Sequence, residues 1–325
     1  MRYFFTKLGP GNSFALPLLD RQELGTPAVA GFFRDVTVAA IEEHLDDEKP
    51  RISYQALDLY RWSHRQIPAV GVTVAAGHIW ILEPAGEMYD LDREQFEACI
   101  GACPHKDDVP KIVPVRIAAD EELTHVPTLL AQLTANRHLS SSTFKEIRDD
   151  FGNQVALDHV LFKRGVIDSY PTIQDGTRDL YHLLLCLGGN ELIALVARLL
   201  EEHGLSVPAP TGGFVKNVDL FVYNDAPREV EVGSPAFGLL RIPPRRTFRH
   251  GAAMLQIRSS AADPRPTVNP EVDFLVQLNA EPAERVLNHA WIADALRHAP
   301  QTRRWLGRIL RWVPFSGTVL RSIAQ

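Results

Sequence analysis

The sequence is poor in cysteine and has no long apolar run. Its 325 residues include three cysteines, too few for the disulfide framework of a small secreted protein. No stretch is apolar over the roughly 20 residues that a membrane-spanning helix needs. The opening MRYFFTKLGPGNSF also lacks the apolar run and small-residue cleavage site of a secretory signal. We therefore expect a cytoplasmic protein with no membrane-spanning segment.

Several motifs of catalysis and metal binding are also missing. Gly212-Gly213 is not followed by the Lys-Ser/Thr step of a phosphate-binding loop. The twelve histidines include no His-x-x-x-His pair. Cys99, Cys103 and His105 have a tolerable spacing for zinc, but a structural zinc site takes four ligands and no second Cys/His pair is present. We therefore favour a reading in which these three residues bind no metal.

The composition is that of a globular protein with about two domains. The chain is 45% hydrophobic and 23% charged, which allows a sizeable core and excludes a disordered chain. The pattern of apolar residues divides it into residues 1–150 and residues 151–325. We expect the first to be a small β-rich α+β domain and the second to be an α/β domain with a mixed central sheet and a helix on each side.

The expected elements of the first domain are mostly strands. Residues 2–8 and 111–117 read as strands, and residues 67–84 read as a hairpin with Ala76-Gly77 near its turn. A helix is predicted over 126–139. In residues 140–152, Ser/Thr followed by Glu146 predicts the start of another helix.

The second domain is predicted to begin and end with helices. Two helical stretches are separated by Gly188-Gly189, and the second, residues 191–203, has leucines and a valine at the 3.6-residue period of an amphipathic helix. A helical tail is expected over 290–313. Strands are expected between them, at residues 205–209, 218–224, 229–233, 253–258 and 272–279.

The net charge of −6 conceals a gradient along the chain. Residues 1–150 carry 15 Lys+Arg against 23 Asp+Glu, residues 151–240 carry 6 against 11, and residues 241–325 carry 13 against 6. Every basic residue of the last part is arginine, which suits bidentate phosphate contact. This asymmetry favours a polyanion partner. The alternative is a solvated helix face. The expected phosphate contacts are Lys216, Arg241, Arg245, Arg246 and Arg249.

Four polar residues occupy positions that suggest a metal site. Glu191 lies at the start of the first long helix of the second domain, and Asp219 lies in an apolar strand. Gln256 and Arg258 lie on one face of a later strand, because side chains alternate along a strand. Mg²⁺ prefers oxygen ligands and retains several waters, and it could activate a water against a phosphodiester. Each residue also has an ordinary interpretation, such as a first-turn glutamate favoured by the helix dipole.

In this order and spacing, Glu191, GGFVKNVDLFVYND and LQIRS resemble the core of the PD-(D/E)XK nucleases, which have the restriction-endonuclease-like fold. The resemblance covers about residues 180–312. It implies that Asp219 and Gln256 hold Mg²⁺ or Mn²⁺, that Glu191 is the helix acid, and that Arg258 stands at the lysine position. It further implies a homodimeric DNA endonuclease acting in restriction or defence against foreign DNA.

Two departures from the family pattern leave an alternative open. Gln256 replaces an acid, although a carboxamide oxygen can still bind a metal. Arg258 replaces a lysine, and arginine stays charged and cannot act as a base. The chain is then either a nuclease with altered chemistry or an inactive nuclease fold that binds nucleic acid or protein. A second placement of the metal ligands, at Glu229 and Glu231, ranks lower because no lysine follows either at two residues.

The first domain carries aromatic residues beside the expected hairpin. Tyr60, Trp62 and Trp80 could stack an extruded base, and the layout is weakly similar to PUA-like or EVE-like domains. The resemblance implies a modification-dependent nuclease. The alternative, which we favour, is that these aromatics belong to the core.

Overall fold

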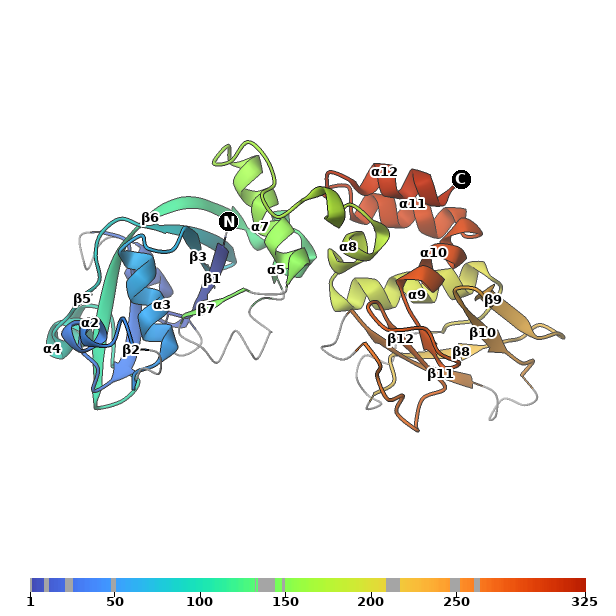
Figure 1. Cartoon of the computed structure of the whole chain (residues 1–325), viewed down its shortest axis with the longest axis horizontal. Coiled ribbons are helices and arrows are strands. Elements are labelled where there is room, and N and C mark those ends of the chain that lie inside the picture. Colours follow the sequence, from blue (N-terminus) through green and yellow to red (C-terminus); the bar gives the residue numbers. More distant parts are fainter. Residues whose placement is uncertain are drawn as a thin grey trace. The chain divides into compact units, whose positions relative to one another are not determined.

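A computed structural model gives the fold in two compact units, Met1–Thr172 and Ile173–Gln325 (Figure 1). The structure describes the chain except for residues 1, 9–11, 21–25, 48–50, 132, 134–143, 148–149, 209–216, 246–251 and 260–263. Among the described residues, no helix has both the length and the apolar character needed to cross a membrane.

The first unit is built on one curled, mixed sheet of seven strands. The strand order is β2-β6-β4-β3-β1-β7, and β5 pairs with β6. Only β1 and β3 pair in parallel among these neighbours. The strands are β1 (Arg2–Thr6), β2 (Ala28–Arg34), β3 (Ala69–Ala75), β4 (His78–Pro84), β5 (Tyr89–Asp90), β6 (Asp108–Glu122) and β7 (Phe144–Glu146).

The long strand β6 explains the curl of this sheet. Its first half pairs with β2 and its second half with β4, and the register with β4 shifts between Ile81 and Leu82. An irregularity of this kind bends a strand and increases its twist. The strand predicted over 111–117 lies within β6.

The predicted hairpin over 67–84 is confirmed. β3 and β4 pair antiparallel, and the turn residues Ala76 and Gly77 have φ values of 50° and 76°. Two positive φ values in a two-residue turn match the right-handed twist of the flanking strands. The predicted strand over 2–8 is likewise present, as β1.

The helix start predicted over 140–152 is wrong at its centre. Phe144–Glu146 form β7, which pairs antiparallel with β1. Phe144 stacks on Phe4 with ring centroids 4.6 Å apart, and Arg2 Nη2 donates to Glu146 Oε2 at 2.7 Å. These contacts join residues more than 130 positions apart, so the local Ser/Thr…Glu pattern carries no sign of them.

In the part of the first unit that the structure describes, six α-helices pack around the sheet. The helix predicted over 126–139 is represented by α5, and 132 and 134–139 lie outside the described residues. The helices are α1 (Ala15–Leu19), α2 (Val38–Glu43), α3 (Tyr54–Ser63), α4 (Arg93–Cys99), α5 (Thr128–Ala131) and α7 (Phe151–Lys163).

Helix α7, which the sequence placed at the start of the second unit, belongs to the first. It packs against α5 and β6. Its Asp158 is fully buried and accepts a hydrogen bond from Tyr3 of β1 and another, at 2.8 Å, from the backbone N–H of Thr172. The division between the units therefore falls after Thr172 instead of after residue 150.

The second unit has a four-stranded mixed sheet with the order β13-β12-β11-β8, and a separate hairpin of β9 and β10. β11 pairs with β8 antiparallel and with β12 in parallel, and β12 pairs with β13 in parallel. The strands are β8 (Leu220–Tyr223), β9 (Val230–Ser234), β10 (Gly238–Ile242), β11 (Ala252–Arg258), β12 (Phe274–Gln277) and β13 (Val286–Leu287).

Among the described residues of the second unit, five α-helices flank this sheet and hairpin, as expected of a mixed α/β domain. The break at Gly188-Gly189 is confirmed, since α8 ends before it and α9 begins in it. Helix α9 buries its leucine face against β8 and β11, and Figure 1 shows α10 to α12 beyond it. The helices are α8 (Leu180–Leu185), α9 (Gly189–Glu202), α10 (His289–Arg297), α11 (Pro300–Ile309) and α12 (Ser316–Ile323).

One strand of this unit was predicted wrongly and three elements were not predicted. Of the strand predicted over 205–209, the described residues 205–208 show only a single bridge, between Ser206 and Tyr223, and residue 209 lies outside the described residues. β10, β13 and α12 had no prediction. The strands predicted over 218–224, 229–233, 253–258 and 272–279 correspond to β8, β9, β11 and β12.

Candidate functional site

Asp219 lies one residue before β8 and makes hydrogen bonds to β11 just beyond the last paired residues of the two strands. The ladder between β8 and β11 ends at Leu220 and Leu255. Beyond it, Asp219 N–H donates to the Leu255 carbonyl at 2.8 Å. Asp219 Oδ2 accepts the Ile257 N–H at 2.7 Å. The half-buried carboxylate therefore satisfies a backbone donor that β8 no longer reaches, as a polar group at such a position must.

Gln256 and Arg258 contact each other on β11. Arg258 Nη2 donates to Gln256 Oε1 at 3.0 Å. Gln256 is 8% exposed and Arg258 is exposed. The structure thus brings three of the four predicted catalytic residues, Asp219, Gln256 and Arg258, to the same end of β11.

Glu191 has a separate role at the start of α9. Its Oε2 accepts the Gly188 N–H at 2.9 Å, so the side chain reaches back to the residue preceding the helix. This is half of a capping box, and it satisfies a donor at the helix start. No hydrogen bond or ion pair given by the structure joins Glu191 to Asp219, Gln256 or Arg258.

The three residues at β11 fit a divalent cation incompletely. Asp219 supplies one carboxylate, whose Oδ1 is not used in the bond to Ile257. Gln256 supplies a neutral oxygen that already accepts from the Arg258 guanidinium, and that positive charge opposes a cation at the same oxygen. In the parts of the chain that the structure describes, no group of three or more His, Cys, Asp or Glu side chains is placed to hold a metal. A magnesium ion here would need waters or the phosphates of a substrate as further ligands.

Two of the arginines predicted to contact phosphate are ion-paired. Arg241 Nε lies 2.9 Å from Glu231 Oε1. Glu231 is one of the two residues of the alternative metal-ligand placement, so this ion pair already engages it. Arg245 Nη1 lies 3.5 Å from Asp225 Oδ1, and its guanidinium lies 4.7 Å from the centre of the Tyr223 ring. The other three, Lys216, Arg246 and Arg249, lie outside the described residues.

The aromatics predicted as base-reading residues lie mostly in the core of the first unit. Trp62 is fully buried, and its Nε1 donates to the Ala69 carbonyl at 3.1 Å. Tyr60 is 6% exposed and donates to Glu42 Oε1 at 2.9 Å. Burial, together with this bond, raises the pKa of Tyr60 to about 12. Trp80 is half-buried, with Nε1 3.4 Å from the Ala75 carbonyl. A fully buried Trp62 offers no face on which a base could stack.

The structure reveals a basic surface on α11, the following turn and α12. Arg304 and Arg308 lie four residues apart on α11 and therefore share a helix face. Arg311 lies in the turn after α11, and Arg321 lies on α12. We call these four exposed side chains the α11–α12 arginine surface. Within the described part of the chain, none of the four makes an ion pair.

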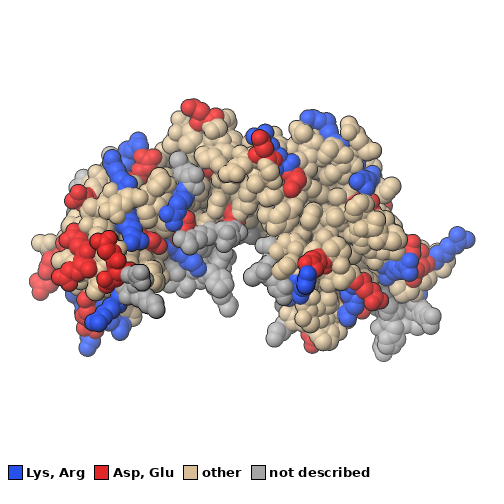
Figure 2. Space-filling model, viewed as in Figure 1, with Lys and Arg blue, Asp and Glu red and all other residues tan. Residues whose placement is uncertain are grey.

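The sequence signal for this surface is an absence of acids. Residues 295–325 contain six arginines and no aspartate or glutamate. The one arginine of this stretch that makes an ion pair among the described residues is Arg297, 3.1 Å from Asp294. Figure 2 shows basic atoms over α11 and α12, whereas acidic atoms gather over α2 and α4 of the first unit.

Capping and packing contacts fix the two helices that carry the α11–α12 arginine surface. Glu202 of α9 accepts the N–H groups of Gln301 and Thr302 at 2.9 and 2.8 Å and so caps the start of α11. Burial alone would raise the pKa of Glu202, but these bonds outweigh it and lower the pKa. At the other side, Leu320 of α12 packs against Gly307 of α11, 3.3 Å from where a Cβ would stand. Arg308 and Arg321 are the sequence neighbours of this contact.

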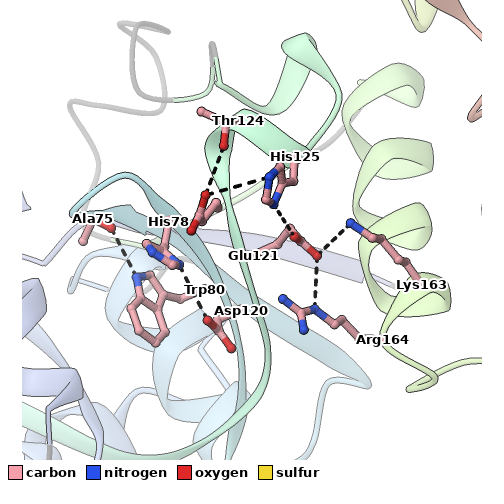
Figure 3. A network of polar contacts seen from close by, with 10 residues as sticks. Ala75, His78, Trp80, Asp120, Glu121, Thr124, His125, Lys163 and Arg164 are labelled. Carbon is pink, nitrogen blue, oxygen red and sulfur yellow. Dashed lines mark hydrogen bonds and ion pairs between the residues drawn. The ribbon is translucent and has the colours of Figure 1, made fainter.

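A second polar network, in the first unit, joins α7 to β6. Glu121 is buried at the end of β6, between His125 and the pair Lys163 and Arg164 (Figure 3). Glu121 Oε2 lies 3.1 Å from Lys163 Nζ and 3.1 Å from Arg164 Nε, and Oε1 lies 3.4 Å from His125 Nδ1. Burial alone would raise the pKa of Glu121, but these contacts outweigh it and lower the pKa. These ion pairs join α7 and the residue after it to the end of β6.

Comparison of the chain with models of protein families, with curated proteins and with solved structures finds no match. The likeness to PD-(D/E)XK nucleases therefore depends on the quoted residues alone.

Proposed function

We propose that the chain is a nucleic-acid-binding protein that contacts the phosphate backbone through the α11–α12 arginine surface. The observation that carries the proposal is the set of four exposed arginines on a stretch without acids, none of them ion-paired among the described residues. A guanidinium presents several N–H donors in a plane that matches a phosphate. Phosphate contacts of this kind supply most of the sequence-independent affinity of nucleic-acid-binding proteins.

The test compares arginines that differ in their pairing. Fluorescence anisotropy with a labelled 20-base-pair DNA duplex in low salt would measure the affinity of the wild type, of the triple variant R304Q/R308Q/R311Q and of R241Q. We expect the triple variant to bind about tenfold or more weakly, because three phosphate contacts are lost. R241Q is the matched control, since Arg241 is already paired with Glu231. Equal affinity of wild type and triple variant would contradict the proposal.

A second candidate function is metal-dependent cleavage of the bound DNA. The placement of Asp219, Gln256 and Arg258 at one end of β11 favours it, because the family pattern requires these positions to lie near one another. The homodimer, the role in restriction and the reading of modified DNA belong to this second candidate.

Cleavage is tested with supercoiled plasmid, modified and unmodified, in Mg²⁺ or Mn²⁺. Asp219→Asn is the sharpest variant, because its amide oxygen can still accept the Ile257 N–H while the negative charge is removed. Nicking or linearisation that disappears in this variant would support the nuclease. If the wild type binds DNA but does not cleave it, the nuclease function is contradicted and only the binding function is supported.

A further inference from the structure

A cavity of about 750 Å³ lies in the first unit. Pockets that bind small molecules have volumes of roughly 300–1,000 Å³. Its lining residues are Arg65, Ile67, Pro68, Ala69, Val70, Glu83, Pro84, Ala85, Arg116 and Pro171.

The cavity combines an apolar interior with a charged rim. Ile67 and Val70 are buried, and the three prolines add rigid apolar rings. Pro171 is fixed in place because the N–H of the next residue, Thr172, bonds to the buried Asp158 at 2.8 Å. The charged side chains are Arg65, Arg116 and Glu83. The shape and the lining therefore suit a small molecule with an apolar body and a negative group.

Arg65 occupies a backbone position that usually belongs to glycine. Its φ is 55°, and it follows His64, the C-cap residue of α3. Arg65 N–H donates to the Trp62 carbonyl at 3.0 Å, and Gln66 N–H donates to the Arg61 carbonyl at 2.8 Å. This pair of bonds is the Schellman motif, in which the left-handed residue is most often glycine because a Cβ is disfavoured there.

An arginine at this position places a charged side chain there, but its backbone is strained because a residue with a Cβ disfavours this conformation. Attraction between a cation and the helix C-terminus offsets part of that strain. Residues held in disfavoured conformations concentrate at functional sites. Among the described residues Arg65 has no acidic partner, and its Nη2 makes one long hydrogen bond, 3.3 Å, to the Pro84 carbonyl. Its guanidinium is therefore available at the rim of the cavity.

Arg116 supplies a second guanidinium that is only partly engaged. Its Nη2 donates to Glu83 Oε2, and its side chain is 68% exposed. A guanidinium has five N–H donors, so the bond to Glu83 orients Arg116 without exhausting it. The three charges sum to +1, in a chain segment whose first 150 residues carry 15 Lys+Arg against 23 Asp+Glu. The lining of this cavity therefore has a net positive charge, whereas the unit around it is acidic.

We propose that this cavity binds a small organic oxyanion, a phosphate monoester or carboxylate joined to an apolar ring. Arg65 and Arg116 bind the oxyanion, and the proline and aliphatic walls cover the ring. The proposal is independent of nucleic-acid binding, because its residues all lie in the first unit and the α11–α12 arginine surface lies in the second.

Isothermal titration calorimetry with four probes tests the proposal: phenyl phosphate, benzoate, inorganic phosphate and benzyl alcohol. We expect saturable binding of phenyl phosphate or benzoate, and at least tenfold weaker binding of inorganic phosphate and benzyl alcohol, because each lacks one half of the recognised structure. The preferred anion identifies the group. No saturable binding of phenyl phosphate or benzoate at 1:1 stoichiometry would overturn the proposal.

Substitution at Arg65 separates binding from folding. Arg65→Gly removes the guanidinium and relieves the left-handed strain, so it is expected to unfold at the wild-type temperature or above it. Its affinity for the preferred probe is expected to fall roughly tenfold to a hundredfold, as for loss of a hydrogen bond to a charged group. Arg34→Gln, an exposed arginine outside the cavity, is the matched control. Unchanged affinity in Arg65→Gly would exclude this residue, and with it the proposal.

Discussion

Glu121→Gln is expected to loosen α7 from β6. The substitution keeps the size of the side chain and an oxygen acceptor, but removes the negative charge that faces Lys163, Arg164 and His125 at 3.1, 3.1 and 3.4 Å. Glu121 is only 4% exposed, so its lost ion pairs are shielded from water on one side.

The magnitude lies between two limits. Breaking a fully buried pair costs about 3–5 kcal/mol because a buried charge is left alone, and an exposed pair contributes about 0.2–1 kcal/mol. Here Lys163 and Arg164 are 47% and 44% exposed and can be rehydrated. We therefore expect a loss of about 1–2 kcal/mol, which corresponds to about 2–8 °C in a unit of this size.

The loss also has a defined dependence on pH. The pKa of Glu121 is lowered in the folded state, so its carboxylate stabilises the unit above the ordinary glutamate pKa. That stabilisation disappears as pH falls through the folded pKa. Wild type and variant should therefore differ at pH 7 and converge toward pH 3.

Hydrogen exchange in α7, read by mass spectrometry, and calorimetric unfolding would measure the effect. Glu122→Gln is the matched control, because Glu122 is its neighbour and 56% exposed, and it should change stability by less than about 0.5 kcal/mol. Equal exchange in α7 of wild type and Glu121→Gln at pH 7 would refute the reasoning, and so would a difference that persists undiminished at pH 3.

Two further substitutions test the packing of each unit. Gly233→Ala should destabilise the second unit by about 2–4 kcal/mol in urea unfolding, because Gly233 has a φ of 89° and a Cβ would stand 2.5 Å from Trp291 Cδ1 and 2.6 Å from the Gly238 carbonyl oxygen. A loss below 1 kcal/mol would show that Trp291 moves away. Tyr3→Phe should cost about 1–3 kcal/mol at pH 7, because it deprives the buried Asp158 carboxylate of a donor. Burial already raises the pKa of Asp158, so the variant should regain stability as pH falls and the carboxyl is protonated; an equal loss at pH 7 and pH 4 would contradict this.

Elements with a complete local signal could be predicted from the sequence. The hairpin of β3 and β4 is marked by two apolar strand-forming runs with Gly77, which accepts positive φ, in the turn between them. Helix α9 is marked by a glycine break followed by a leucine face. β7 could not be predicted, since its three residues are strand-forming only beside β1, whose sequence is remote. The same holds for α7, whose attachment to the first unit depends on the Tyr3–Asp158 and Glu121 contacts.

The candidate site shows the same limit. The sequence placed Asp219, Gln256 and Arg258 close together, and the structure agrees that they lie at one end of β11. The sequence could not show that the Asp219 carboxylate accepts a hydrogen bond from the Ile257 N–H, or that Arg258 donates a hydrogen bond to the Gln256 side-chain oxygen. Glu191 follows its ordinary first-turn interpretation, because its carboxylate reaches the Gly188 N–H. The sequence predicted phosphate contacts for the arginines of residues 241–249 because they are clustered. In the structure, Arg241 and Arg245 form ion pairs with acids on neighbouring segments.

The salt dependence of DNA binding tests the central claim most directly. If Arg304, Arg308, Arg311 and Arg321 each neutralise a phosphate, log K should fall against log salt with a slope of about −3.6, and each single Arg→Gln substitution should reduce that slope by about 1. Arg241→Gln should leave it unchanged. A slope near zero for the wild type, or one that the four substitutions do not alter, would contradict phosphate binding at α11 and α12.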